Sequence, residues 1–151
     1  MTIAADNATI AAALTILARR LEQKRSGNVV SCPQTVRDFL TLRYAEKPVE
    51  VFGAILLDGG NRVIEVRELS HGTVNQAAVY PREMVRAAIE CNAAGAILFH
   101  NHPSQRAEPS HADHSLTDNL RSALRTVDIQ CLDHLIVAGA THYSFAENGL
   151  I

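Results

Sequence analysis

Two histidines stand on either side of one asparagine where an apolar run ends. The run "AAGAILF" (93–99) is followed by His100, Asn101 and His102, and Pro103 then ends the predicted strand. Because side chains alternate across a strand, His100 and His102 point to one face and Asn101 points to the other. Two imidazoles on one face can chelate one metal ion, but histidines at strand ends are more often hydrogen-bonded or solvated. The pair alone leaves both interpretations open.

A serine and an aspartate follow the histidine pair at a short distance. Seven residues separate His102 from Ser110, and Asp113 stands three positions further on, at the start of a predicted helix. Ser-x-x-Asp is by itself a capping box, in which the serine caps the helix and the acid binds the backbone N–H of the cap. A loop this short also returns the helix start to the strand end, where Asp113 can supply a third ligand. Three protein ligands with one position left open is the arrangement of a catalytic zinc site.

A catalytic metal site also needs an acid/base that takes a proton from water and delivers it to the leaving group. We predict Glu50 for this role, because it begins an otherwise apolar strand, "EVFGAILLD", where a carboxylate has little structural reason to stand. The alternative is a solvated residue at a strand end. Glu46, Glu65 and Glu68 are weaker candidates, since they lie in a loop or beside other polar residues of a strand.

The elements that must position these residues follow from hydrophobic periodicity. Helical spacing of apolar residues predicts four helices, over 8–25, from Pro33 through "QTVRDFLTLRYA", over 81–92 and over 110–128. Apolar runs predict strands over 50–58, 62–69 and 95–102 and a closing pair in "CLDHLIVAG" and "THYSFAE". The core side of the last helix should carry Leu116, Leu120, Ala123, Leu124 and Val127. This order predicts the α/β (α+β) class with a mixed sheet, rather than strict βαβ alternation.

Length and composition limit the class of protein. The 151 residues suffice for one domain with a buried core, and 14 Lys+Arg against 16 Asp+Glu leave a net charge of -2. This balance gives no global basic surface for nucleic acid, and the basic residues of 19–25 are interpreted as the solvated face of one helix. The three cysteines are widely spaced, which indicates a reducing compartment rather than a disulfide framework. The sequence shows no signal-peptide pattern and no apolar run of ~20 residues, so we expect a cytoplasmic protein with no membrane span.

These segments together resemble the RadC family. The likeness rests on "EVFGAILLD", "GTVNQAAVYPREMVRAAIECNAAGAILFHNHPS", "PSHADHSLT" and "LDHLIVAG", and it runs from about residue 31 to the C-terminus. The RadC family that these segments resemble is a bacterial branch of the JAMM (MPN-type) metalloprotease fold. We therefore expect an N-terminal helical extension over 1–30 and a RadC-like JAB/MPN domain over 31–151, as in short RadC-like proteins.

The resemblance implies a fold and a set of roles. The fold is a curved mixed β-sheet flanked by helices, with the cytidine-deaminase-like MPN/JAB architecture. Matched position by position to the family motif, His100, His102 and Asp113 bind one zinc ion per chain. Glu50 is then the general acid/base, and Ser110 helps to hold the oxyanion of a tetrahedral intermediate. JAMM enzymes cleave peptide or isopeptide bonds with the metal polarising water and carbonyl, so the expected partner is a peptide or protein substrate.

Two other classes of function stay open from the sequence. One is a DNA-repair-associated protein that binds DNA, as the name RadC suggests, and the other is a non-catalytic metal-binding interaction module. The near-neutral charge weighs against DNA binding. The letters H-N-H are no nuclease signature, since the residues that name those nucleases are dispersed through a ββα element. A homodimer is compatible with each of these functions.

A few positions depart from the family or lie outside its motif. The family usually has glycine where Gln105 follows "HNHPS", and often has histidine where Tyr80 precedes "PRE". Neither position is a ligand. Five further histidines match no ligand position, and among them we expect His134, in "LDHLIV", to be buried and hydrogen-bonded.

Overall fold

The structure is a computed structural model that describes residues 2–23, 33–72 and 78–151. Within these residues it has four helices and five strands: α1 (Ile3–Gln23), α2 (Pro33–Tyr44), β1 (Val51–Leu57), β2 (Val63–His71), α3 (Pro81–Glu90), β3 (Gly95–Asn101), α4 (His111–Arg125), β4 (Gln130–Ala138) and β5 (Thr141–Ser144). The strands form one open sheet in the order β2–β1–β3–β4–β5. The expected class, a mixed sheet flanked by helices, is confirmed.

The sheet is mixed because one of its connections is a helical crossover. β1 runs antiparallel to both β2 and β3, and β5 runs antiparallel to β4, but β3 and β4 are parallel. A parallel pair cannot be joined by a tight turn, and α4 supplies the required crossover. The β1–β2 hairpin closes at the predicted turn, where Asn61 adopts a left-handed φ of 57°. The Asp58 carboxylate accepts the backbone N–H groups of Gly60 and Arg62 there.

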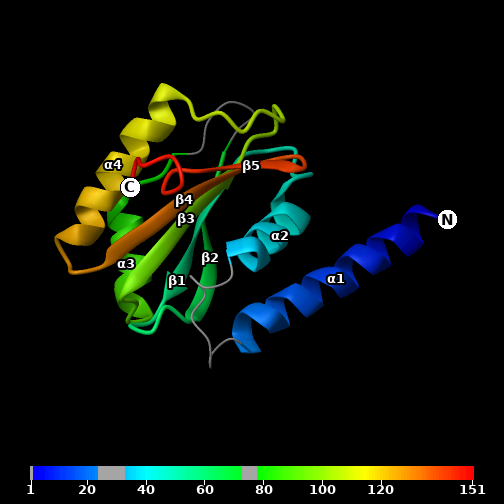
Figure 1. Cartoon of the computed structure of the whole chain (residues 1–151), viewed down its shortest axis with the longest axis horizontal. Coiled ribbons are helices and arrows are strands. Elements are labelled where there is room, and N and C mark those ends of the chain that lie inside the picture. Colours follow the sequence, from blue (N-terminus) through cyan, green and yellow to red (C-terminus); the bar gives the residue numbers. More distant parts are fainter. Residues whose placement is uncertain (1, 24–32, 73–77) are drawn as a thin grey trace.

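Helices cover both faces of the sheet and divide the core into two parts. α3 and α4 lie on one face and α2 on the other, with α1 outside α2 (Figure 1). β1 and β3 lie between these layers, and every residue of both strands is buried. On the α2 side the largest buried side chains are Phe39, Leu40, Tyr44, Ile55 and Phe99. On the α3/α4 side they are Phe52, Leu56, Met84, Leu98, Leu120 and Leu124. The two central strands are therefore buried between two helical layers, and β3 carries His100, with His102 directly after its last residue.

The predicted order of elements is correct, and the differences lie at the ends of helices and strands. α4 ends at Arg125, so Val127, expected on the core side, is 37% exposed. The chain leaves the helix after Arg125 and turns at Asp128, whose φ is 59°. The helical spacing of apolar residues continues to Val127 in the sequence, which is why the predicted helix was too long. In α1, whose described side chains end at Arg20, only Leu17 is buried. The predicted boundary between the extension (1–30) and the domain (31–151) lies outside the described residues.

None of the described helices combines the length and the hydrophobicity that a membrane crossing requires.

Candidate metal centre

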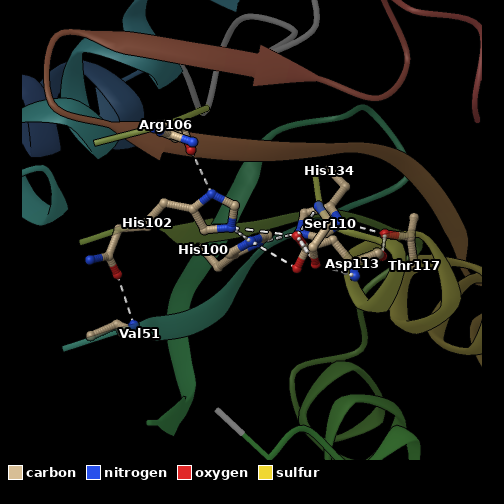
Figure 2. Close-up of polar contacts among 9 residues, drawn as sticks. Val51, His100, His102, Arg106, Ser110, Asp113, Thr117 and His134 are labelled. Carbon is tan, nitrogen blue, oxygen red and sulfur yellow. Dashed lines mark hydrogen bonds and ion pairs between the residues drawn. The ribbon is translucent and has the colours of Figure 1, made fainter. Parts of the chain in front are cut away.

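Three side chains converge at the end of β3 and the start of α4. His100 Nε2 lies 2.9 Å from His102 Nε2 and 3.2 Å from Asp113 Oδ1, and His102 Nε2 lies 3.5 Å from Asp113 Oδ2 (Figure 2). His100 and Asp113 are buried, and His102 is half-buried. Their ligand atoms all fall within 4.8 Å of one another. This is a buried group that could hold a metal ion, and it consists of the three residues predicted as ligands.

Asp113 serves the helix cap and the histidine cluster at the same time. Ser110 Oγ accepts the Asp113 backbone N–H at 3.2 Å, and Asp113 Oδ2 accepts the Ser110 backbone N–H at 2.7 Å, which completes a capping box. The Ser110 hydroxyl also donates to Oδ2, at 2.6 Å. Oδ2 is therefore occupied by the cap, while Oδ1 faces His100. The two interpretations of Ser-x-x-Asp were not exclusive, because the cap orients the carboxylate that completes the cluster.

The tautomer of His102 is set by the loop that follows it. His102 Nδ1 lies 2.7 Å from the backbone carbonyl oxygen of Arg106. A carbonyl oxygen only accepts hydrogen bonds, so Nδ1 carries the proton and donates it. In the neutral ring, Nε2 is then left with its lone pair. Nε2 faces His100 and Asp113 (Figure 2).

The tautomer of His100 is set by a chain of three groups. Thr117 Oγ1 donates to the Asp113 backbone carbonyl at 2.6 Å, so it accepts from His134 Nδ1, also at 2.6 Å. Burial lowers the pKa of His134 far below its ordinary value, and the neutral ring carries its single proton on Nδ1. His134 Nε2 therefore accepts from His100 Nδ1 at 2.8 Å. His100, like His102, is left with a lone pair on Nε2.

Two lone pairs facing each other at 2.9 Å need a positive charge beside them. Either a proton on one ring or a metal ion next to both can supply it. The supporting groups thus hold both imidazoles in the form that a metal ion requires, with the outer nitrogen hydrogen-bonded and the inner nitrogen free. The hydrogen bonds of the outer nitrogens therefore fix which atom of each ring faces the cluster.

The charges of the cluster also favour a cation. Burial disfavours the Asp113 carboxylate. When no ion is bound and the imidazoles carry the extra proton on Nε2, hydrogen bonds and charge from His100 and His102 outweigh burial and hold the pKa of Asp113 well below its ordinary value. The hydrogen bond to Asp113 in turn raises the pKa of His102, although burial opposes this shift. Asp113 is therefore ionised at neutral pH, and it presents a negative charge to the two inner nitrogens.

Glu50 lies directly before β1 and within electrostatic reach of all three residues. Its side chain is half-buried, and burial raises its pKa. The charges of His100 and His102 oppose this shift, and that of Asp113 adds to it. Its predicted role as acid/base stays a prediction, as does that of Ser110.

The other glutamates considered from the sequence have partners elsewhere or lie at the surface. Glu65 accepts two hydrogen bonds from Arg67, and Glu68 accepts one from Tyr44. Glu46 is exposed.

Comparison with known proteins decides the family. The model of the RadC-like JAB domain matches residues 30–150 of the chain. The chain belongs to the RadC family. The full span of the match includes β1, the histidine pair, the helix cap and β4, so every residue of the RadC cluster lies inside it.

Curated relatives of this RadC chain carry no activity in their names. A UPF0758 protein of Methylibium petroleiphilum is 49% identical over 148 residues, which cover 97% of this chain and 67% of the relative. A UPF0758 protein of Chromobacterium violaceum is 51% identical over 91% of this chain and 62% of its own length. One of Aromatoleum aromaticum is 53% identical over 89% and 61%. The chain thus spans about two thirds of the length of the relatives it matches.

Two supporting residues of the RadC site were not assigned a role from the sequence. His134 was expected to be buried and hydrogen-bonded, and it is, with none of its surface exposed. Its contact with His100 was not predicted. Thr117 was not considered at all, although its position one helical turn after Asp113 is a signal that could have found it.

The loop after the histidine pair has an unusual backbone at Gln105. This residue, at the position where the sequence comparison led us to expect glycine, adopts a φ of 64°, in the left-handed region that glycine enters most easily. Its side chain lies against Gly139, where an added Cβ would meet Gln105 Oε1 at 2.4 Å. The loop of this RadC chain therefore keeps the glycine-like conformation, and Gly139 leaves the space for the larger side chain.

Proposed function

We propose that this domain is a zinc-dependent hydrolase of the JAMM type that cleaves a peptide or isopeptide bond in a peptide or protein substrate. The observation that carries the proposal is the grouping of two imidazole nitrogens and one carboxylate oxygen, from His100, His102 and Asp113, within 4.8 Å of one another. Membership of the RadC-like JAB family supports the reaction class.

The donor set fits zinc. Imidazole nitrogen and carboxylate oxygen are ordinary zinc ligands, and ligand bonds of ~2.0–2.1 Å in a tetrahedral arrangement place neighbouring ligand atoms about 3.3 Å apart. The two Nε2 atoms lie 2.9 Å apart, Asp113 Oδ1 lies 3.2 Å from His100 Nε2 and Asp113 Oδ2 lies 3.5 Å from His102 Nε2, so small side-chain adjustments would bring one carboxylate oxygen and both nitrogens to that spacing. Three protein ligands leave one position open, as in catalytic rather than structural zinc sites. A divalent ion bound here would supply Lewis acidity, which lowers the pKa of water and polarises a carbonyl.

The protein's own contribution to the reaction is assigned to Glu50 and Ser110. Glu50, whose pKa is raised by burial, would take a proton from the attacking water and give it to the leaving amine. A raised pKa suits a group that must both accept and release a proton near neutral pH. Ser110 is exposed, and its hydroxyl would turn from Asp113 Oδ2 toward the developing oxyanion.

Metal analysis tests the binding half of the proposal. The purified protein should carry about one zinc per chain, and His100→Ala should lose it. His111→Ala is the matched control, because His111 is exposed at the first turn of α4 and contributes nothing to the cluster. A folded wild-type protein that binds no zinc under saturating conditions would refute the proposal at this step.

Hydrolysis tests the catalytic half. We would use a pool of fluorogenic peptides that includes ε-linked lysine isopeptides, with wild type and Glu50→Gln compared at equal zinc content. The variant should keep zinc and lose at least 100-fold in kcat, within the range that a positioned acid/base contributes. Zinc binding with no difference between the two proteins would instead identify a non-catalytic metal-binding module.

A further inference from the structure

Asn101, the residue between the two histidines, makes three hydrogen bonds to a different part of the chain. Its Oδ1 accepts the backbone N–H of Val51 at 2.7 Å. Its Nδ2 donates to the backbone carbonyl of Val49 at 3.1 Å and, more weakly, to that of Lys47 at 3.5 Å. The side chain is 1% exposed, so these bonds are not shared with bulk water. Asn101 does point away from the histidine cluster, as predicted, and the segment before β1 is what it holds.

The residue enclosed by these bonds is Glu50. The backbone pairing of β1 with β3 begins at Phe52, opposite His100, so Glu50 lies beyond the last backbone pair. The Asn101 amide continues the connection by bonding to the residues on either side of Glu50. From the β2 side, the Gly72 backbone N–H donates to the Glu50 carbonyl at 2.7 Å. The backbone of Glu50 is therefore held from both neighbouring strands.

An amide is the side chain suited to this task. The site needs an acceptor for Val51 N–H and a donor for Val49 C=O on two adjacent atoms, and asparagine offers both. An ionised aspartate would lack the donor and place a charge against the Val49 carbonyl. A hydroxyl could serve only one of the two bonds well. Because Asn101 is 1% exposed, bulk water does not reach these groups, and a substitution that removes one partner leaves a buried polar group unpaired.

We propose that Asn101 is a positioning residue, which fixes Glu50 relative to the metal ligands through its bonds to Val49 and Val51. His100 and His102 flank Asn101 at the end of β3, so three consecutive residues place the ligands on one face and hold the segment of the proposed acid/base from the other. The inference rests on the proposed function, because it gives Glu50 a reason to need a fixed position. A displacement of ~1 Å of a catalytic group can lower a rate by about 100-fold.

The test compares Asn101→Ala with wild type by three measurements. Hydrogen exchange of the Val51 amide should accelerate at least tenfold, since its acceptor is removed. The dissociation constant for zinc alone, measured by chelator competition, should change less than threefold. On the same fluorogenic peptide pool, kcat should fall by about 10- to 100-fold with KM little changed. Asn148→Ala is the matched control, since its amide donates to the Ser144 carbonyl at 2.8 Å, away from Glu50.

A double mutant separates positioning from general damage. In a Glu50→Gln background, Asn101→Ala should cause no further loss of kcat, because the group it positions is already gone. An equal loss in both backgrounds would overturn the proposal, as would unchanged exchange at Val51 or loss of zinc on Asn101→Ala. Should the alanine variant not fold, Asn101→Ser is measured in its place, with the same three outcomes expected at smaller size. If wild type hydrolyses nothing, the proposed function fails, while exchange and zinc affinity still decide whether Asn101 holds the Glu50 segment independently of the ligands.

Discussion

Replacing Thr117 with valine tests how the hydrogen bonds behind His100 support metal binding. Thr117 is 1% exposed, and valine keeps nearly the same shape while removing the hydroxyl that joins His134 to the Asp113 carbonyl. His134 Nδ1–H is then buried with no acceptor, which costs about 1–3 kcal/mol. The His134 ring can instead carry its proton on Nε2, which faces His100 Nδ1. His100 must then accept on Nδ1 and carry its own proton on Nε2, the nitrogen proposed to bind the metal.

The first outcome lowers stability alone, whereas the second also weakens zinc binding, and we expect the second because it removes the unpaired N–H. Loss of an outer partner of a metal-bound histidine typically lowers metal affinity by about 10- to 100-fold, or ~1.4–2.7 kcal/mol. We therefore expect Thr117→Val to bind zinc 10- to 100-fold more weakly, and to lose ~1–3 kcal/mol in the free energy of unfolding measured with a chelator present.

The assay is competition for zinc against a chromophoric chelator, with urea unfolding alongside. Thr126→Val is the control, because Thr126 makes an equally short hydrogen bond, 2.6 Å to the Ala123 carbonyl, but is exposed and lies beyond the end of α4. It should change neither quantity by more than ~0.5 kcal/mol. The reasoning is refuted if Thr117→Val loses stability yet binds zinc as tightly as wild type, since the tautomer of His100 would then not depend on Thr117.

Three further outcomes follow from the structure. Gly53→Ala should lower the free energy of unfolding in urea by about 1–3 kcal/mol, because the added Cβ would meet a ring carbon at 2.5 Å and a backbone oxygen at 2.6 Å, whereas Gly59→Ala, with nothing within 4 Å, should be neutral. The Asp113 carboxylate raises the pKa of His102 above its ordinary 6.5, so zinc affinity should fall as pH is lowered through that raised pKa; an affinity independent of pH from 8 to 5.5 would contradict this. Burial raises the pKa of Cys131 to about 12, so iodoacetamide at about pH 8 should label it only after unfolding, as read by mass spectrometry.

The ligand trio could be predicted from the sequence because its geometry is local. His100 and His102 share a face through strand alternation, and the seven-residue loop limits how far Asp113 can lie from them. The interactions that fix the tautomers could not be predicted in the same way. His134 is 34 positions from His100, and their contact depends on β4 pairing with β3 in parallel, in a register that places His134 opposite Leu98. Periodicity identifies strands, but it does not say which strands are neighbours.

Asn101 shows a second limit of pattern-based prediction. Strand alternation correctly predicted that the Asn101 side chain faces away from the metal site, so no role was assigned to Asn101 from the sequence. Its hydrogen-bond partners are backbone groups about 50 positions earlier, and backbone groups leave no trace in residue types. The position of Val127 was wrong for a related reason, since the apolar spacing continues past the point where the chain leaves the helix.

The proposed metal ligands and the proposed acid/base come from different parts of the chain. The three proposed ligands, together with Thr117 and His134, all come from one continuous stretch, β3–α4–β4, residues 95–138. Glu50 comes from outside this stretch and is attached to it through the antiparallel partner strand β1. Under the proposed function, a lineage could therefore lose catalysis by a single change near β1 and keep its ion, or regain catalysis the same way. Retained ligands in a distant homologue would then indicate a metal site, while the residue at the position of Glu50 would indicate separately whether that homologue can act as an enzyme.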